Sequence, residues 1–376
     1  MSINATPNNF SCMSNLSLIS LLETISHQTS PAPEILTALI NLELADQPRC
    51  QAFNITPDTV ETEIITRMQQ FSALKTPLLQ KLHPVITPTQ LALTLWQFWL
   101  PFTRHLVNYQ QSQGKPVIQG ILGGQGTGKS TLVSALTLIL ESMGCRGVAL
   151  SLDDVYKTYE ERQALQKQDP RLIWRGPPGT HDLTLADSVL QQFRAGTDPL
   201  ELPQFDKSAW GGAGDRTTPK RVHRADILLF EGWFVGVQPL PDSQLIDLFK
   251  TQQFPPIVTE TDEKFGRDMN QNLWDYVPLW QQLDRLMVLL PQDYRFSKQW
   301  RQSAEHLMKS QGKSGMSDGE ISEFVDYFWK ALHPLLFIEP LTQNDPRVDC
   351  VVRINADHSL LQISCLTKSL IDTFNR

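Results

Sequence analysis

The chain has 376 residues and a formal net charge of −7; 41% of its residues are hydrophobic and 19% are charged. This composition supplies enough apolar side chains for a folded core and excludes an intrinsically disordered chain. The acidic balance argues against a protein that coats nucleic acid or an anionic membrane, because both require a strongly basic surface.

The five cysteines are scattered and form no C-x-x-C pair, which argues against a disulfide scaffold or a zinc ribbon and favours a reducing compartment. No stretch reaches the roughly 18 apolar residues that a membrane span needs. The N-terminal segment also lacks the basic residues of a signal peptide. We therefore expect a soluble, cytoplasmic protein without a nucleic-acid or membrane partner.

Residues 1–113 are predicted to form a helical region without recognisable chemistry. Two Thr-Pro pairs, Thr56-Pro57 and Thr87-Pro88, place a capping hydroxyl before a proline at the first helical position. Pro101 is expected to kink or divide the second of these helices. Four aromatic residues around it are expected in a packed core rather than on a binding face: Trp96, Phe98, Trp99 and Phe102.

Four apolar runs of strand length follow, each bounded by Gly, Pro or Asp: residues 116–122, 148–152, 225–232 and 284–290. Strands that are apolar throughout are buried on both faces, as in a parallel sheet with helices on each side. A basic helical stretch, an amphipathic helix opened by a capping box at Ser317, and two strands at 348–354 and 360–364 follow. The expected fold is α/β, with a mostly parallel sheet, helices on both faces and an all-helical N-terminal region.

Residues 123–130, GGQGTGKS, fit the pattern G-x-x-x-x-G-K-[ST] between an apolar strand and a helix. Such glycines let backbone N–H groups point at phosphate oxygens, the lysine reaches the β- and γ-phosphates, and the hydroxyl ligates Mg²⁺. The motif predicts a P-loop domain over residues 114–376. The residues predicted to bind ATP, with Ser130 also holding Mg²⁺, are Gly123, Gly124, Gln125, Gly126, Thr127, Gly128, Lys129, Ser130 and Thr131.

Acidic residues follow two of the predicted strands, at the sheet edge where open α/β folds bind ligands. Asp153 comes directly after the run at 148–152, and we predict that it accepts the proton of the attacking substrate hydroxyl. Its neighbours Asp154 and Tyr156 are predicted to contact the substrate. Glu231 ends another apolar run, the position expected of a Mg²⁺ partner behind a P-loop.

Two loops rich in Gly and Pro, residues 175–183 and 202–216, are also dense in charge. Loops of this kind carry function more often than packing. A small carboxylate substrate requires an arginine or a lysine, and its hydroxyls require a carboxylate. The substrate-binding candidates in these loops are Arg175, His181, Asp182, Lys207 and Arg216, with solvated loop charge as the alternative for each.

A basic stretch at about 295–316 is predicted as a lid that closes over ATP, delivers cations to the transferred phosphoryl group and excludes water. Arg301 is the preferred catalytic member of this lid, and a solvated helix face is the alternative. The basic residues of the stretch are Arg295, Lys298, Arg301, Lys309 and Lys313.

In this order, the P-loop, SLDDVY, RGPPGTHDL, LPQFDKSAWGGAGDR, LLFEGWFVG and WRQSAEHLMKSQGKSGMSDGE closely resemble the D-glycerate 3-kinase family. That family belongs to the phosphoribulokinase, uridine kinase and pantothenate kinase group of P-loop kinases. The resemblance covers roughly residues 114–365, and FDKSAW, FEGW and GKSGMSD are its more specific segments. The lid departs from the pattern, because it lacks the closely spaced arginines of the uridine kinase branch.

The resemblance implies transfer of the ATP γ-phosphate to the 3-hydroxyl of D-glycerate, giving 3-phospho-D-glycerate in photorespiratory glycolate metabolism. By position, it implies Asp153 as catalytic base, Glu231 as the Mg²⁺-associated acid, Asp182 as a contact of a substrate hydroxyl and Arg301 in the lid. Two other functions stay open. One is a kinase of the same fold that acts on a nucleoside, pantothenate or a sugar phosphate, and the other is an ATP-binding regulatory module without an acceptor.

Overall fold

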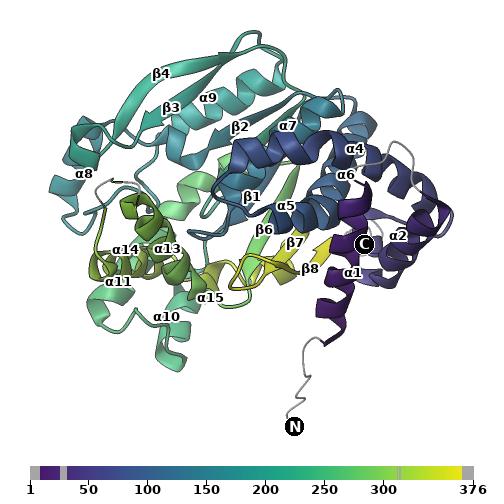
Figure 1. Cartoon of the computed structure of the whole chain (residues 1–376). Helices are drawn as coiled ribbons and strands as arrows, with labels where there is room; N and C mark the ends of the chain where they lie inside the picture. The colour runs from purple at the N-terminus through teal and green to yellow at the C-terminus, as the bar shows by residue number, and fades with distance from the viewer. Residues whose placement is uncertain (1–8, 26–31, 311, 313–314, 366–376) are drawn as a thin grey trace, which may run out of the picture.

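A six-stranded sheet of order β2-β5-β1-β6-β7-β8 forms the centre of the computed structural model, which describes residues 9–25, 32–310, 312 and 315–365 (Figure 1). Its strands are β1 (Val117–Gly123), β2 (Gly147–Ser151), β5 (Ile227–Gly232), β6 (Arg285–Pro291), β7 (Val348–Ile354) and β8 (Leu360–Cys365). All neighbouring pairs are parallel except β7 with β8. The predicted mostly parallel α/β sheet is confirmed.

A separate antiparallel hairpin of β3 (Leu200–Asp206) and β4 (Asp215–Val222) stands beside the sheet (Figure 1). The loop predicted over residues 202–216 is therefore wrong, because only the hairpin tip lacks strand structure. Both strands carry a proline and β4 is polar, so neither shows an apolar run. The register shifts between Leu202 and Gln204, around a proline that has no N–H to donate.

The N-terminal region is helical, as predicted: α1 (Asn9–Ile25), α2 (Pro33–Ala45), α3 (Gln47–Phe53), α4 (Val60–Leu82), α5 (Pro88–Thr94), the π-helical segment η1 (Leu95–Trp99) and α6 (Leu100–Gln113). Thr87 caps α5 in a capping box. Pro101 lies in the first turn of α6, directly after η1, and the backbone stays helical from α5 through α6, so a kink or division at Pro101 stays a prediction. The start predicted at Thr56-Pro57 is wrong: α4 begins at Val60, after a turn in which Thr59 N–H bonds to the Thr56 carbonyl.

The remaining helices connect the strands or cover the sheet: α7 (Lys129–Ser142), α8 (Tyr159–Gln168), α9 (Leu183–Arg194), α10 (Asp242–Thr251), α11 (Glu260–Asn272), α12 (Val277–Trp280), α13 (Phe296–Ser310), α14 (Asp318–Ala331), α15 (Pro334–Phe337) and α16 (Leu341–Asn344). Short 3₁₀ segments are η2 (Leu152–Val155), η3 (Trp210–Gly212) and η4 (Leu273–Tyr276). The capping box predicted at Ser317 opens α14, which confirms that prediction.

Two apolar clusters cover opposite faces of the sheet. Alternate residues of β1 belong to different clusters: Val117 and Ile121 pack with the N-terminal helices and α7, whereas Ile118 and Leu122 pack with α9, β3 and η4. The N-terminal helices thus share one core with the sheet, and they lie on one side of the molecule, opposite the hairpin (Figure 1). The aromatic residues predicted to be core are all buried: Trp96, Phe98, Trp99 and Phe102.

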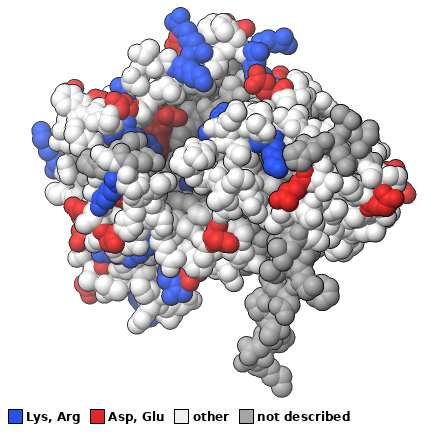
Figure 2. Space-filling view, in the orientation of Figure 1, with Lys and Arg blue, Asp and Glu red and all other residues white. Residues whose placement is uncertain are grey.

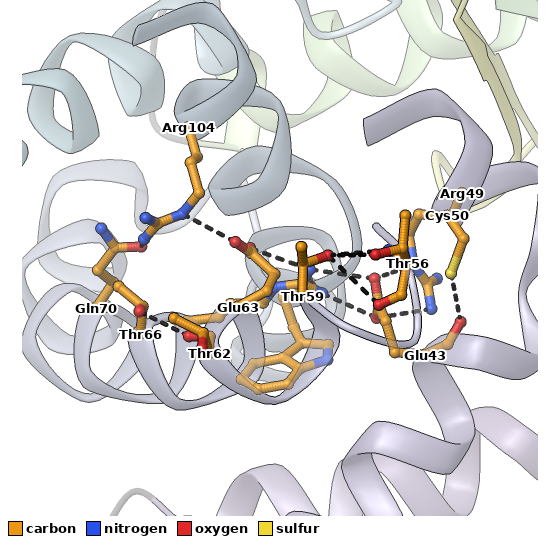
Figure 3. Close-up of polar contacts among 12 residues, drawn as sticks. Glu43, Arg49, Cys50, Thr56, Thr59, Thr62, Glu63, Thr66, Gln70 and Arg104 are labelled. Atoms are coloured by element: carbon orange, nitrogen blue, oxygen red, sulfur yellow. Dashed lines mark hydrogen bonds and ion pairs between the residues drawn. The ribbon is translucent and has the colours of Figure 1, made fainter. Parts of the chain in front are cut away.

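A buried ion cluster holds the N-terminal helices together (Figure 3). The Glu43 carboxylate on α2 accepts hydrogen bonds from Arg49 at 3.1 and 3.2 Å and from Arg67 at 2.9 and 3.1 Å. Arg67 also contacts Glu63 at 3.3 Å, and Glu63 pairs with Arg104 of α6 at 3.2 Å. The cluster therefore joins α2, α3, α4 and α6. Its centre, Glu43 with Arg49 and Arg67, is buried, whereas Glu63 and Arg104 are partly exposed.

Charged side chains of both signs are interspersed on the face that Figure 2 shows, with uncharged residues between them. In the described part of the chain, no helix has the length and apolar character that crossing a bilayer would require.

Candidate active site

The P-loop links the end of β1 to the start of α7. Its backbone turns through Gly126 and Gly128, whose φ angles of 76° and 86° lie in the left-handed region that favours glycine. Lys129 Nζ donates to the Gly124 carbonyl at 3.0 Å, and Thr127 Oγ1 donates to the same oxygen at 2.9 Å. Burial lowers the pKa of Lys129, and the nearby charges of Glu231 and Asp153 oppose that lowering. The loop thus brings together backbone N–H groups, a helix N-terminus and one half-buried lysine, a combination that suits an anion.

Two aromatic residues from distant segments hold the outside of this loop. His358, in the turn between β7 and β8, donates through Nε2 to the Gly126 carbonyl at 2.7 Å. Its ring stacks on Trp300 of α13 at 4.3 Å between centroids, and Trp300 donates to the Ala356 carbonyl at 2.6 Å. A Cβ added to Gly126 would lie 2.6 Å from Trp300 Cβ, so the indole packs directly on the loop.

Three carboxylates face the P-loop from neighbouring strands. Glu231, near the end of β5, accepts a hydrogen bond from Ser130 Oγ at 3.1 Å. Asp153 and Asp154 lie in η2, directly after β2, as predicted. Burial raises the pKa of Asp154 to about 6, and the charges of Asp153 and Glu231 add to the rise.

The donors present fit a hard cation. Ser130, Asp154 and Glu231 are among the residues that line a cavity of about 880 Å³ formed by α7, β2 and the β3–β4 hairpin. Within the described residues, no group of three or more His, Cys, Asp or Glu side chains is arranged to hold a metal ion. Mg²⁺ does not require one, because it commonly binds through one or two carboxylates, water and substrate phosphates.

Asp153 is held by two donors. Tyr156 donates its hydroxyl to Oδ1 at 2.8 Å, and Lys207 of the hairpin donates Nζ to Oδ2 at 2.6 Å. Burial acts to raise the pKa of Asp153, but the charge and hydrogen bond of Lys207 outweigh it and hold the pKa below its ordinary value. The carboxylate is therefore ionised at neutral pH and can accept a proton.

His181 lies against Tyr156, with ring centroids 4.6 Å apart and planes at 23°. It is almost fully buried, and burial lowers its pKa to about 3, so the imidazole is neutral at pH 7. Its Nδ1 lies 2.8 Å from the hydroxyl oxygen of Tyr276, whereas its Nε2 is buried without a hydrogen-bond partner. The structure thus joins four predicted site residues in one group: Asp153, Tyr156, His181 and Lys207.

The other substrate-binding candidates are engaged with the chain around this group. Arg216 donates to Asp182 Oδ2 at 2.7 Å and to the Tyr156 carbonyl at 2.9 Å, and Asp182 also caps α9. Arg175 donates to the carbonyls of Gly212 and Ala213 at 2.8 and 2.9 Å. These contacts fix the hairpin tip and the start of α9 around Tyr156, and the substrate contacts of all three residues stay predictions.

Arg301 points toward α14 rather than toward the P-loop. Its guanidinium lies 3.2 Å from Glu305 Oε2 and 5.7 Å from the centre of the Phe324 ring. Lys298 of the same helix pairs with Asp326 at 2.7 Å, and Lys313 lies outside the described residues. α13 does border the P-loop, but it does so through Ser297 and Trp300. The catalytic role of Arg301 therefore stays a prediction.

Tyr276 and His358 lie outside all the sequence motifs, and Trp300 lies at the start of one of them without a role predicted for it. Tyr276 and His181 are 95 residues apart, and His358 and Gly126 are 232 residues apart. Neither spacing corresponds to a local pattern, so the pairs become visible only in the folded chain.

No protein-family model matches the chain. The chain is 36% identical over 234 residues to the uncharacterized kinase mug58 of Schizosaccharomyces pombe. The aligned region spans 60% of this chain and 83% of that protein. It is 33% identical over 256 residues to the chloroplastic D-glycerate 3-kinase of Arabidopsis thaliana. Here the aligned region spans 64% of this chain and 53% of that protein. A solved structure of D-glycerate 3-kinase from Cryptococcus neoformans superposes with a TM-score of 0.63 at 26% identity, covering 70% of this chain and 99% of that one.

Proposed function

Because this chain belongs to the P-loop kinases of the phosphoribulokinase and uridine kinase group, we propose that it phosphorylates the 3-hydroxyl of D-glycerate with ATP. The observation that carries the proposal is an ionised Asp153 beside the P-loop lysine, framed by Tyr156, His181 and Lys207. The named D-glycerate 3-kinases among its relatives support the choice of acceptor.

Asp153 acts as the general base in this reaction. The 3-hydroxyl of D-glycerate donates its proton to the carboxylate while its oxygen attacks the γ-phosphorus of ATP. The bond between that phosphorus and the β–γ bridging oxygen breaks, and ADP leaves as 3-phospho-D-glycerate forms. Lys129 and the N–H groups of residues 124–130 stabilise the negative charge on the phosphoryl oxygens.

Ser130, Glu231 and Asp154 would hold Mg²⁺ together with the nucleotide. The ion supplies positive charge to the β- and γ-phosphates in this class of reaction. Burial is the main cause of the raised pKa of Asp154, and the charges of Asp153 and Glu231 add to it; a divalent cation beside the carboxylate would favour its ionised form.

Lys207 is the cation best placed for the carboxylate of the substrate. Its side chain is 61% exposed, so it can move, and it already reaches the base from the hairpin. Arg175, Asp182 and Arg216 shape the surrounding loops. Of these, Asp182 supplies the carboxylate proposed to contact a hydroxyl of the substrate. Arg301 reaches the transferred phosphoryl group only if it leaves Glu305, as lid closure over ATP requires.

A panel of acceptors tests the proposal. ADP release is followed at fixed MgATP with D-glycerate, L-glycerate, uridine, pantothenate, a sugar phosphate or no acceptor. We expect D-glycerate to be preferred by orders of magnitude, with the new phosphoester on the 3-oxygen. A preference for uridine or pantothenate would overturn the choice of acceptor, and hydrolysis that no acceptor stimulates would favour a regulatory ATPase.

A further inference from the structure

The imidazole of His181 has one ring nitrogen in a defined hydrogen bond and one without a partner. Nδ1 lies 2.8 Å from the Tyr276 hydroxyl, and Nε2 is buried and unpaired. Buried polar atoms in folded proteins are nearly always hydrogen-bonded, so an orphaned ring nitrogen beside a predicted general base requires an explanation.

The proton on this imidazole can be assigned from the hydrogen bonds of Tyr276. The Gly179 N–H donates to the Tyr276 oxygen at 2.9 Å. Tyr276 is fully buried, so its hydroxyl proton requires an acceptor, and among the described residues the acceptor within reach is His181 Nδ1 at 2.8 Å. What the phenol offers to Nδ1 is therefore its own proton.

Nδ1 of His181 is therefore an acceptor without a proton. A neutral imidazole carries one proton, which must then lie on Nε2. The group that has no partner is consequently an N–H donor, and it belongs to a ring stacked on the tyrosine that donates to Asp153.

Lys207 Nζ and the Tyr156 hydroxyl each contact one oxygen of Asp153, so a substrate hydroxyl that donates to this carboxylate binds beside both groups. The Tyr156 ring is stacked on the His181 imidazole, so an acceptor bound at Asp153 lies near the two rings. There an N–H donor selects for an oxygen that accepts a hydrogen bond, such as one of a carboxylate, and it discriminates against a group that can only donate.

We propose that Tyr276 is a positioning residue that fixes His181 as the neutral Nε2–H tautomer, and that this N–H donates to a carboxylate oxygen of the acceptor. The second half rests on the proposed function, whereas the tautomer does not. Neither residue needs to change its protonation during turnover. His181 contributes binding and orientation, and Asp153 takes the proton.

Nitrogen-15 NMR of the full chain with labelled histidine measures the tautomer directly, and the spectrum of His181→Gln assigns the signals. We expect a protonated-type signal at Nε2 and an unprotonated-type signal at Nδ1. Tyr276→Phe should release the preference and populate the other tautomer. A wild-type Nδ1–H tautomer, or an unchanged spectrum in Tyr276→Phe, would overturn the inference.

Kinetics with D-glycerate test the donor. His181→Asn, which has no amide at the Nε2 position, should raise the KM for D-glycerate about tenfold or more and leave the KM for ATP unchanged. His181→Gln, whose amide can reach that position, should restore much of the loss. Equal KM values in His181→Asn and wild type would overturn the role of the donor.

Tyr327→Phe is the matched control for loss of a buried hydroxyl, because Tyr327 donates to the Trp174 carbonyl at 3.2 Å, within a different apolar cluster. It should lose some stability and keep both KM values. The tautomer measurement requires no acceptor. A chain that rejects D-glycerate would overturn the proposed function alone, and a wrong tautomer would overturn this inference alone.

Discussion

The ammonium of Lys207 lies 2.6 Å from Oδ2 of Asp153, so a cation from the β3–β4 hairpin rests on the proposed general base. The contact keeps the carboxylate ionised in spite of its burial. The lysine side chain is 61% exposed, so the same cation can also meet an acceptor that binds at this carboxylate. The hairpin therefore helps to set the charge of the base.

Asp153→Asn should lower kcat at least about 100-fold, because an amide cannot accept the proton of the substrate hydroxyl. Nucleotide affinity should stay close to wild type, since the hydrogen-bond partners of the Asp153 carboxylate are Tyr156 and Lys207 rather than residues of the P-loop. Steady-state kinetics with isothermal titration of ATP separates the two effects.

Lys129→Ala is the contrasting variant, since it should lose activity and ATP affinity together. Near-normal turnover in Asp153→Asn would refute the assignment of the base. An active Lys129→Ala protein with unchanged ATP affinity would contradict the role of the P-loop.

Lys207→Met should shift the acid limb of the pH–rate profile to higher pH. Lys207 lowers the pKa of Asp153 and burial raises it, so removing the lysine leaves burial unopposed. The base is then protonated at a higher pH, and activity fails earlier as pH falls. The variant also loses the proposed charge-assisted hydrogen bond from Lys207 to the carboxylate of the acceptor. A bond of this kind contributes about 1.5–3 kcal/mol, so kcat/KM for the acceptor should fall about 10- to 100-fold.

The exposed Lys167 on α8 provides a control of equal charge change. Lys167→Met should leave the profile unchanged. An acid limb that does not move in Lys207→Met would show that another group sets the pKa of the base.

His358→Ala should raise the KM for ATP about fivefold with little change in kcat, because a hydrogen bond of about 1 kcal/mol to the Gly126 carbonyl is lost. Titration of ATP measures the effect. His306→Ala serves as the control, since His306 is exposed and pairs with Asp318 away from the P-loop. A variant with normal ATP affinity and reduced kcat would place His358 in the reaction rather than in support of the loop.

Glu43→Gln should lower the free energy of unfolding by about 3–5 kcal/mol, because it leaves Arg49 and Arg67 buried without a carboxylate. Chemical denaturation measures the loss, and the exposed Glu23→Gln on α1 should change it little. A stability equal to that of wild type would show that the arginines find other partners.

The same ion cluster should make the free energy of unfolding decrease at acidic pH. Burial acts to raise the pKa of Glu43, but Arg67 and Arg49 outweigh it and lower the pKa below its ordinary value. A carboxyl of this kind stabilises the fold above its unfolded pKa of about 4.5, and that contribution is lost as pH falls through the folded value. Glu43→Gln should accordingly flatten the decline in stability below about pH 4.5.

The sequence predicts those parts of the molecule that depend on local pattern. The P-loop requires glycines at fixed positions, and β1, β5 and β6 of the central sheet appear as short apolar runs because they are almost completely buried. The hairpin is not predicted, because β4 is polar and exposed and each strand contains a proline. Its strands are stabilised by pairing with each other, which composition does not reveal.

The residues of the candidate site also fall into two groups, those that a local sequence pattern predicts and those that distant segments contribute. Asp153 and Glu231 are predicted because each follows or ends a strand beside the P-loop. The partners of His181 and Gly126 come from distant segments, and only the packing of η4 and of the β7–β8 turn brings Tyr276 and His358 to them.

The shared core has a consequence for how the protein is made. α3 contacts β8, and the buried Cys50 and Phe53 belong to the same apolar cluster as Ile363. During synthesis, the ribosome releases α3 long before β8 exists, so this apolar face stays uncovered while the whole catalytic region is translated. Exposed surface of this kind favours aggregation and attracts chaperones. The apolar core around the N-terminal helices is therefore complete only after β8 has been synthesised and has packed against α3.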